Sequence, residues 1–98
     1  MPHVEREVIV SNKLGLHARP AMQFVDLANQ FNSKISVHRA EPEKIDADGK
    51  SVMEMIILAA TKGTTLKIVA DGDDAEKAVN ELIALFDNKF GEDEKGQV

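Results

Sequence analysis

The 98-residue sequence contains no cysteine, tryptophan or tyrosine, and it has four phenylalanines. Without cysteine the chain has no disulfide framework, no thiolate metal site and no cysteine nucleophile. So few aromatic rings leave little material for platforms on which nucleic-acid bases stack. Seventeen acidic residues outnumber twelve basic ones, for a net charge of −5. This balance argues against nucleic acid as the main partner, because phosphate backbones require clustered Lys and Arg.

Long apolar runs are also missing. No segment approaches the ~20 apolar residues that a membrane-spanning helix needs, and the charged residues 1–10 do not resemble a signal peptide. We therefore expect a cytoplasmic protein without membrane insertion. The length and the 43% hydrophobic content predict one globular domain over residues 1–90. The acidic residues 91–98 show no apolar periodicity and are expected to form a flexible tail.

The periodicity of the apolar residues predicts the element order β-α-β-β-α-β-α. Strands are expected at residues 4–10, at 34–39, around Ile45 and at 64–70, and helices from 17 or 18 onward, at 51–60 and at 73–90. Pro20 marks the first turn of the first helix, where its missing N–H costs nothing. These elements predict an α+β fold in which a four-stranded antiparallel sheet is covered on one face by three helices.

Helix faces and caps follow from the same pattern. Asp73 with Glu76, and Ser51 with Glu54, fit capping boxes at the starts of the last two helices. The apolar face of the first helix is expected to comprise Ala18, Ala21, Met22, Val25 and Ala28, flanked by Phe24, Leu27 and Phe31.

Residues 15–21 read GLHARPA and place His17 at or beside the N-cap of the first helix. Free backbone N–H groups and partial positive charge make such a helix start an anion site. Gly15 and Ala18 contribute this phosphate-stabilising backbone, and Arg19 adds donors suited to phosphate oxygens. A neutral imidazole keeps a lone pair that can attack a phosphoryl donor. We interpret the segment as a phosphoryl relay, with His17 and Arg19 as its catalytic residues.

The segment NKLGLHARPAMQF closely resembles the active-site signature of the HPr histidine phosphocarriers of the bacterial phosphotransferase system. The resemblance extends to DGKSVMEMIILAATKG and to the last helix, and it covers residues 4–90. It implies the open-faced β-sandwich of that family, with His17 phosphorylated on Nδ1 and Arg19 stabilising the phosphohistidine. It also implies enzyme I, charged from phosphoenolpyruvate, as the donor and IIA domains of sugar permeases as acceptors. We expect a monomer without cofactor or metal.

Other functions remain open. The segments NKLG, HARPAM and ALFDNKF also resemble the nitrogen-related branch of the family, which would keep the chemistry and replace the sugar permeases by a regulatory IIA. A non-catalytic regulatory binding protein is a further alternative. A hydrolase with His17 as general base is disfavoured, because no Ser or Cys nucleophile with an orienting Asp appears in a motif context.

The second helix, VMEMIILAA, is apolar on nearly all sides. Met55, Leu58 and Ala59 share one side and are expected in the core. A second set is surplus to the core and predicts a partner-docking surface, since exposed apolar clusters mark interaction sites. This set comprises Val52, Met53 and Ile56.

Ser51 has two interpretations. It fits an N-cap, and many Gram-positive members of the family carry a matching serine that a regulatory serine kinase/phosphorylase modifies. Glu54 stands where those proteins typically have glycine, and its carboxylate would repel a phosphoserine. His3 and His38 are expected to be surface residues without a metal role.

Overall fold

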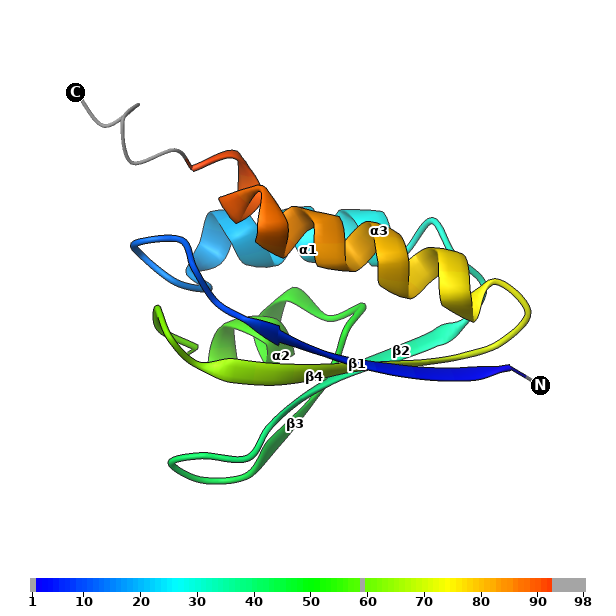
Figure 1. Cartoon of the computed structure of the whole chain (residues 1–98), viewed down its shortest axis with the longest axis horizontal. Helices are drawn as coiled ribbons and strands as arrows, with labels where there is room; N and C mark the ends of the chain where they lie inside the picture. Colours follow the sequence, from blue (N-terminus) through cyan, green and yellow to red (C-terminus); the bar gives the residue numbers. More distant parts are fainter. Residues whose placement is uncertain (1, 59, 93–98) are drawn as a thin grey trace.

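The computed structural model describes residues 2–58 and 60–92, and it contains one four-stranded antiparallel sheet (Figure 1). The strands lie in the order β1-β4-β2-β3, so that β1 and β3 form the two edges. Their bounds are β1 His3–Ile9, β2 Lys34–Arg39, β3 Ile45–Asp48 and β4 Thr65–Asp71. The bounds of β2 agree with the prediction, and the other strands differ from it by a residue or so because alternation alone does not show where ladder hydrogen bonding stops.

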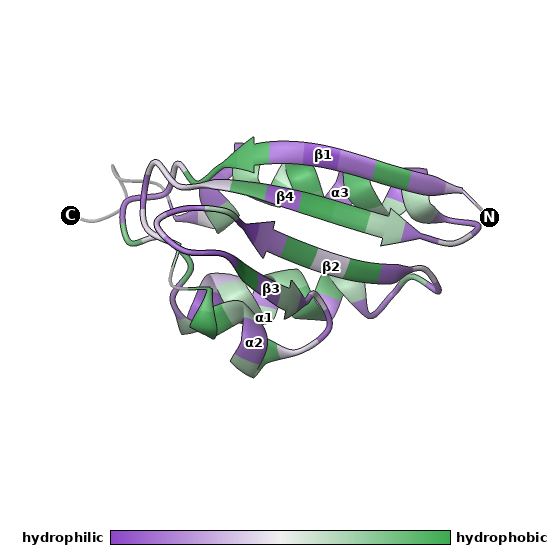
Figure 2. Ribbon diagram, turned by 90° about the horizontal axis from the view of Figure 1, so that it is seen from below, coloured by the Kyte–Doolittle hydropathy of each residue, from purple (hydrophilic) through white to green (hydrophobic). Residues whose placement is uncertain are grey.

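Three helices cover one face of this sheet and leave the other face open (Figures 1 and 2). They are α1 Ala18–Ala28, α2 Val52–Ile57 and α3 Ala75–Asp87, followed by a short 3₁₀ helix, η1 Lys89–Gly91. Helix α3 packs on β1 and β4, whereas α2 packs on β3 and on α1. The predicted α+β open-faced architecture is confirmed. Helix α2 is shorter than the predicted 51–60 span, since it ends in a C-cap at Leu58.

The core lies between the helices and the sheet, and three phenylalanine rings run through it. The Phe24 and Phe86 centroids are 6.1 Å apart, those of Phe86 and Phe90 are 4.8 Å apart, and both pairs meet edge to face. This is a favoured arrangement for aromatic pairs. Because Phe90 belongs to η1, the end of the described chain is packed into the core rather than lying loose on the surface.

The apolar face of α1 is narrower than predicted. Ala21, Val25 and Ala28 are buried together with Phe24, in the i, i+3, i+4, i+7 spacing of a core-facing stripe. Ala18 and Met22 are exposed instead. Met22 follows Ala21 by one residue, which turns it about 100° around the helix and away from the core. The sequence pattern could not separate these two sets, because alanine and methionine fit either side.

The predicted capping box at the start of α3 is wrong. The N-cap is Asp74 rather than Asp73, and its side chain makes no bond to its own helix. Its carboxylate instead accepts hydrogen bonds from the backbone N–H groups of Asn32 (2.9 Å) and Ser33 (3.0 Å) and from the Ser33 hydroxyl. These bonds, the Ser33 hydroxyl first, hold the pKa of Asp74 below its usual value. Asp74 thereby joins α3 to the turn before β2.

Candidate functional site

The loop before α1 is fixed by a close backbone approach. Gly15 has φ +69°, and a Cβ there would lie 2.4 Å from the Ala60 carbonyl oxygen, so both the conformation and the space require glycine. The next amide, of Leu16, donates to that same carbonyl at 2.8 Å. The Gly15 carbonyl in turn accepts from the His17 N–H at 3.0 Å. This packing sets the position from which α1 begins.

His17 is the N-cap of α1, as predicted. Its φ of −83° and ψ of −171° are extended, and its carbonyl accepts the helical bond from the Ala21 N–H at 3.1 Å. The imidazole makes no capping bond and is 37% exposed. The amides of Ala18 and Arg19 lie in the first turn, where N–H groups have no carbonyl partner within the helix. The geometry therefore brings one imidazole to a cationic helix start.

The Arg19 side chain is exposed on the first turn of α1. Its guanidinium forms no hydrogen bond or ion pair with any residue in 2–58 or 60–92. The exposed Lys13 lies in the preceding loop. The structure thus places Arg19 two residues after His17, in the first turn of α1 and without a hydrogen bond to the imidazole, so that its five N–H donors are available to an incoming anion.

A carboxylate from the other end of the chain meets the imidazole. Glu92 Oε2 lies 2.7 Å from His17 Nε2, and Glu92 Oε1 accepts from the Asn12 side-chain amide at 2.9 Å. The same amide group donates to the Gly15 carbonyl at 2.7 Å. The other ring nitrogen, Nδ1 of His17, has no hydrogen-bond partner among the described residues. The site therefore combines one engaged and one open imidazole nitrogen.

The candidate docking surface lies on α2, next to α1. Met53 is 70% exposed and Ile56 is 38% exposed, as the sequence predicts. Val52, which was expected on the same surface, is instead half buried and packs against the core. Ile57, 58% exposed, belongs to the same surface and was not expected there. Met55 and Leu58 are fully buried, whereas Ala59 lies outside the described residues.

Ser51 is the N-cap of α2, and half of the predicted capping box forms. Its hydroxyl accepts from the Glu54 N–H at 3.2 Å. The Glu54 carboxylate does not return to the Ser51 amide; it accepts from the Asp48 N–H at 2.8 Å, and the Ser51 amide donates to the Asp48 carbonyl. Glu54 thus places a carboxylate over the turn beside Ser51.

The remaining histidines lie on strands, at the sheet face opposite the helices. His3 contacts Glu5 and Asp71, whose hydrogen bonds raise its pKa, Glu5 having the larger effect. His38 bonds to Asp46, which lowers the pKa of that carboxyl. Within residues 2–58 and 60–92, no three His, Cys, Asp or Glu side chains are grouped as metal ligands would be.

Sequence reasoning missed Glu92 and Asn12. Glu92 lies in the segment expected to be a flexible tail, and nothing in GEDEKGQV signals a contact with His17. The predicted boundary at residue 91 stays a prediction, since residues 93–98 lie outside the described part of the chain. The sequence signals for Asn12 were its place a few residues before a candidate nucleophile and at the start of the segment NKLGLHARPAMQF. None of the described helices is long and apolar enough to cross a membrane.

Comparisons with known proteins identify a family for the chain. The family model for the phosphotransferase-system HPr component phosphorylation site matches residues 4–88. The chain is 43% identical over 88 residues to the phosphocarrier protein HPr of Pseudomonas aeruginosa, covering 90% of this chain and 96% of that protein. It is 41% identical over 88 residues to the phosphocarrier protein NPr of Proteus mirabilis, with the same coverage.

Solved structures resemble the fold equally well. An HPr structure from Thermoanaerobacter tengcongensis superimposes with a TM-score of 0.84 at 39% identity, covering 92% of this chain and 98% of that one. The HPr of Bacillus anthracis gives a TM-score of 0.79 at 36% identity, covering 88% and 99%. A match over most of the chain, in sequence and in structure, establishes the family. The chain belongs to the HPr family of phosphotransferase-system phosphocarriers.

Proposed function

We propose that the chain accepts a phosphoryl group on His17 from enzyme I, charged by phosphoenolpyruvate, and passes it to IIA domains of sugar permeases. The observation that carries this proposal is the open Nδ1 of His17 at the start of α1. A carrier of this kind is a phosphorylated intermediate rather than an independent catalyst, and we expect it to work as a cytoplasmic monomer.

The chemistry follows from the local charges. The lone pair of His17 Nδ1 forms the new N–P bond as the bond between phosphorus and the donor breaks. The phosphoryl oxygens then lie at the first turn of α1, where the amides of Ala18 and Arg19 and the guanidinium of Arg19 supply hydrogen-bond donors. The backbone amides are in place before the phosphoryl group arrives, so little reorganisation of the backbone opposes the transfer.

We assign partner docking to Met53, Ile56 and Ile57, with Val52 at the edge of the surface. The three exposed side chains share α2, which packs against α1. A partner that covers them gains apolar burial beside the imidazole. Methionine suits such a surface because its flexible thioether adapts to partners of different shape, and a carrier must bind both a donor and an acceptor.

A nitrogen-branch carrier that feeds a regulatory IIA is the second candidate. The similarity to the NPr of Proteus mirabilis, nearly as high as that to the HPr of Pseudomonas aeruginosa, supports this candidate. Both candidates share His17, Arg19 and the docking surface. They differ in the donor and acceptor proteins, so that side-by-side transfer from the sugar-type and the nitrogen-type enzyme I would separate them.

The test of the proposed function is labelling from radioactive phosphoenolpyruvate in the presence of enzyme I. We expect the wild-type chain to take an acid-labile, alkali-stable label and His17→Ala to take none while keeping its fold. His38→Ala is the matched control, because it removes an imidazole from the sheet and should label as the wild type does. Full labelling of His17→Ala would overturn the assignment.

A further inference from the structure

We propose that Glu92 is a positioning residue for His17, which holds the imidazole with its proton on Nε2 and keeps the Nδ1 lone pair available for the phosphoryl group. The proposal rests on the proposed function and adds a residue to it. It depends on the contact of 2.7 Å between Glu92 Oε2 and His17 Nε2.

The direction of this hydrogen bond fixes the tautomer. An ionised carboxylate can only accept, so the ring nitrogen that faces it must carry the hydrogen. A neutral imidazole has a single N–H, and its other nitrogen then bears the lone pair. With Nε2–H donating to Glu92, that lone pair is on Nδ1, the nitrogen without a partner among the described residues. The same bond also fixes the orientation of the ring.

Glu92 is itself held both at its carboxylate and at its backbone. Its second oxygen accepts from the side-chain amide of Asn12, a residue that is 1% exposed. The Glu92 N–H donates to the Lys89 carbonyl at 2.8 Å. The Glu92 side chain is only 12% exposed, compared with 37% for the imidazole. Glu92 is therefore a largely buried side chain with a fixed position, in contrast to a solvent-exposed carboxylate.

Core packing explains why a residue so far along the chain reaches this place. Lys89 and Phe90 have φ of 54° and 56°, a conformation that residues other than glycine rarely adopt. Such a turn persists only where its surroundings determine it. Here Phe90 is buried against Phe86, and its carbonyl accepts from the Gln23 side chain at 3.1 Å. Figure 1 shows the resulting position of η1 beside the start of α1.

The contact gains strength as the phosphoryl group arrives. When the Nδ1 lone pair forms the N–P bond, the donor's bond to phosphorus breaks and the Nε2 proton stays in place. The ring thereby acquires a positive charge next to the phosphoryl oxygens. The Glu92 carboxylate lies against the Nε2–H and stabilises that charge, as an oriented carboxylate does for an imidazolium in general acid–base sites. Glu92 therefore favours the loaded carrier as well as the correct tautomer.

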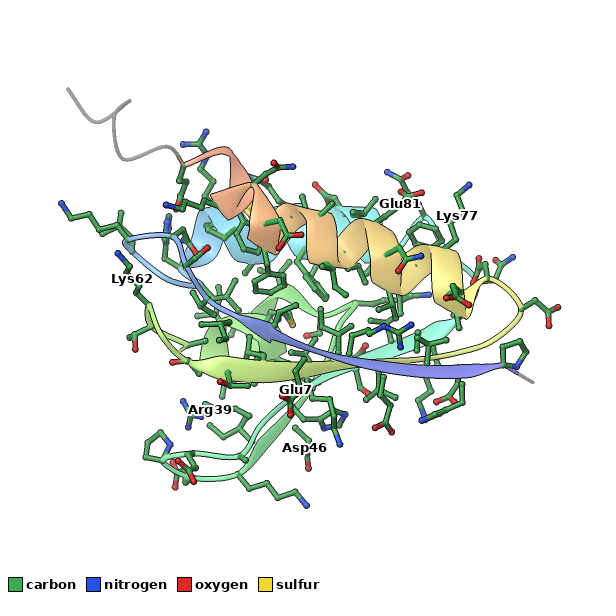
Figure 3. All side chains as sticks on the ribbon, viewed as in Figure 1. Glu7, Arg39, Asp46, Lys62, Lys77 and Glu81 are labelled. Carbon is green, nitrogen blue, oxygen red and sulfur yellow. The ribbon has the colours of Figure 1, made fainter. Side chains whose placement is uncertain are left out.

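The test compares Glu92→Ala and Glu92→Gln with Glu7→Gln, which removes one negative charge from the sheet face opposite the helices (Figure 3). In nitrogen-edited NMR of the full chain, we expect a His17 Nε2–H that exchanges at least about tenfold faster in Glu92→Ala than in the wild type. The initial rate of labelling should fall at least about fivefold at an unchanged affinity for enzyme I. Glu92→Gln keeps an acceptor oxygen without the charge, so it should retain the Nε2–H tautomer and still label more slowly.

Two results would overturn the proposal: a wild-type His17 that carries its proton on Nδ1, or a labelling rate of Glu92→Ala that equals that of Glu7→Gln. Thermal melts show whether each variant folds, and Glu92→Gln keeps the test valid if Glu92→Ala unfolds. Failure of the proposed function looks different. In that case the wild-type chain takes no label from enzyme I, although the exchange of its Nε2–H still depends on Glu92.

Discussion

Imidazoles lie in two regions of this molecule, and the two regions leave them in different states. On the open face of the sheet, His38 uses both ring nitrogens: Nδ1 bonds to Asp46 at 2.7 Å and Nε2 to the Ser36 hydroxyl at 2.8 Å. At the start of α1, the hydrogen bond that His17 makes within residues 2–58 and 60–92 is through Nε2, to Glu92. Both regions therefore place a carboxylate next to a histidine. They differ because Nδ1 of His17 has no hydrogen-bond partner among the described residues, whereas both ring nitrogens of His38 have one.

The cause is the backbone on which each ring stands. On a sheet, side chains two residues apart and side chains on paired strands share a face. His38 consequently meets Ser36 along its strand and its register partner Asp46 across the sheet. A helix N-cap has no such neighbours, and free N–H groups take their place. Local geometry thus gives both ring nitrogens of an imidazole a hydrogen-bond partner on the sheet and leaves one nitrogen available at the helix start.

The largest effect is expected when the cation near His17 is removed, and a cation on the open face of the sheet supplies the control. Arg19→Ala should slow phosphoryl transfer at least about a hundredfold, because it removes at least two charge-assisted hydrogen bonds to the phosphoryl oxygens, each of which contributes about 1.5–3 kcal/mol. Affinity for the unphosphorylated partner should barely change. Lys67→Ala removes a cation from the open face, where it pairs with Glu5 at 3.6 Å, and should leave the rate unchanged. Rapid-quench transfer assays measure both. Equal slowing in the two variants would remove the distinction between the regions.

A smaller effect is expected from the docking surface. Met53→Asp should weaken binding to enzyme I by at least tenfold, because it removes an apolar contact worth roughly 1.5–3 kcal/mol and places a carboxylate in the interface. Thr65→Asp introduces the same charge at an exposed position of β4 and should bind normally. Calorimetric titration gives the affinities, and thermal melts should show little change for Met53→Asp. A variant that unfolds, yet binds normally when folded, would place Met53 in the core.

Ser51 tests whether the neighbourhood of the site tolerates added charge. Ser51→Ala should lower the free energy of unfolding by about 0.5–2 kcal/mol through the lost cap of α2. Ser51→Asp should keep the stability, since aspartate also caps and favours the helix N-terminus, and it should slow transfer by placing charge beside the docking surface. Denaturant titration and transfer assays measure the two effects. If Ser51→Asp transfers at the wild-type rate, Ser51 is a cap and nothing more.

The smallest effect is a pH dependence confined to the open face. Hydrogen bonds to Glu5 and Asp71 raise the pKa of His3 above 6.5 in the folded protein. Its contribution to stability is therefore complete below the unfolded pKa and is lost as pH rises through the folded value. The melting temperature of the wild type should consequently fall more between about pH 6 and 9 than that of His3→Gln. Identical profiles would show that the His3 contacts do not persist in solution.

The sequence predicted those parts of the molecule that local patterns determine. Alternation located β2, and Pro20 located the start of α1, because each depends on a few neighbouring residues. Exposure on α2 was predicted for Met53 and Ile56, since the helix was too apolar for one buried face. Ile57 was missed because helical spacing does not show how much of the helix the sheet and α1 cover.

The parts that failed depend on contacts between distant segments. Asp74 caps the turn before β2 instead of its own helix, which only the folded arrangement brings within reach. Glu92 reaches His17 because Lys89 and Phe90 adopt positive φ, a turn for which their residue types give no signal. Candidate chemistry at His17 was therefore visible in the sequence, whereas the residue that orients its ring was not.

The most direct test of this account is to locate the phosphoryl group. The chain is loaded from phosphoenolpyruvate and enzyme I, and nitrogen and phosphorus NMR then identify the phosphorylated atom. The account predicts a single N–P bond at Nδ1 of His17, with the proton retained on Nε2 and with unmodified rings at His3 and His38. A phosphoryl group on Nε2 of His17, or on either strand histidine, would contradict it.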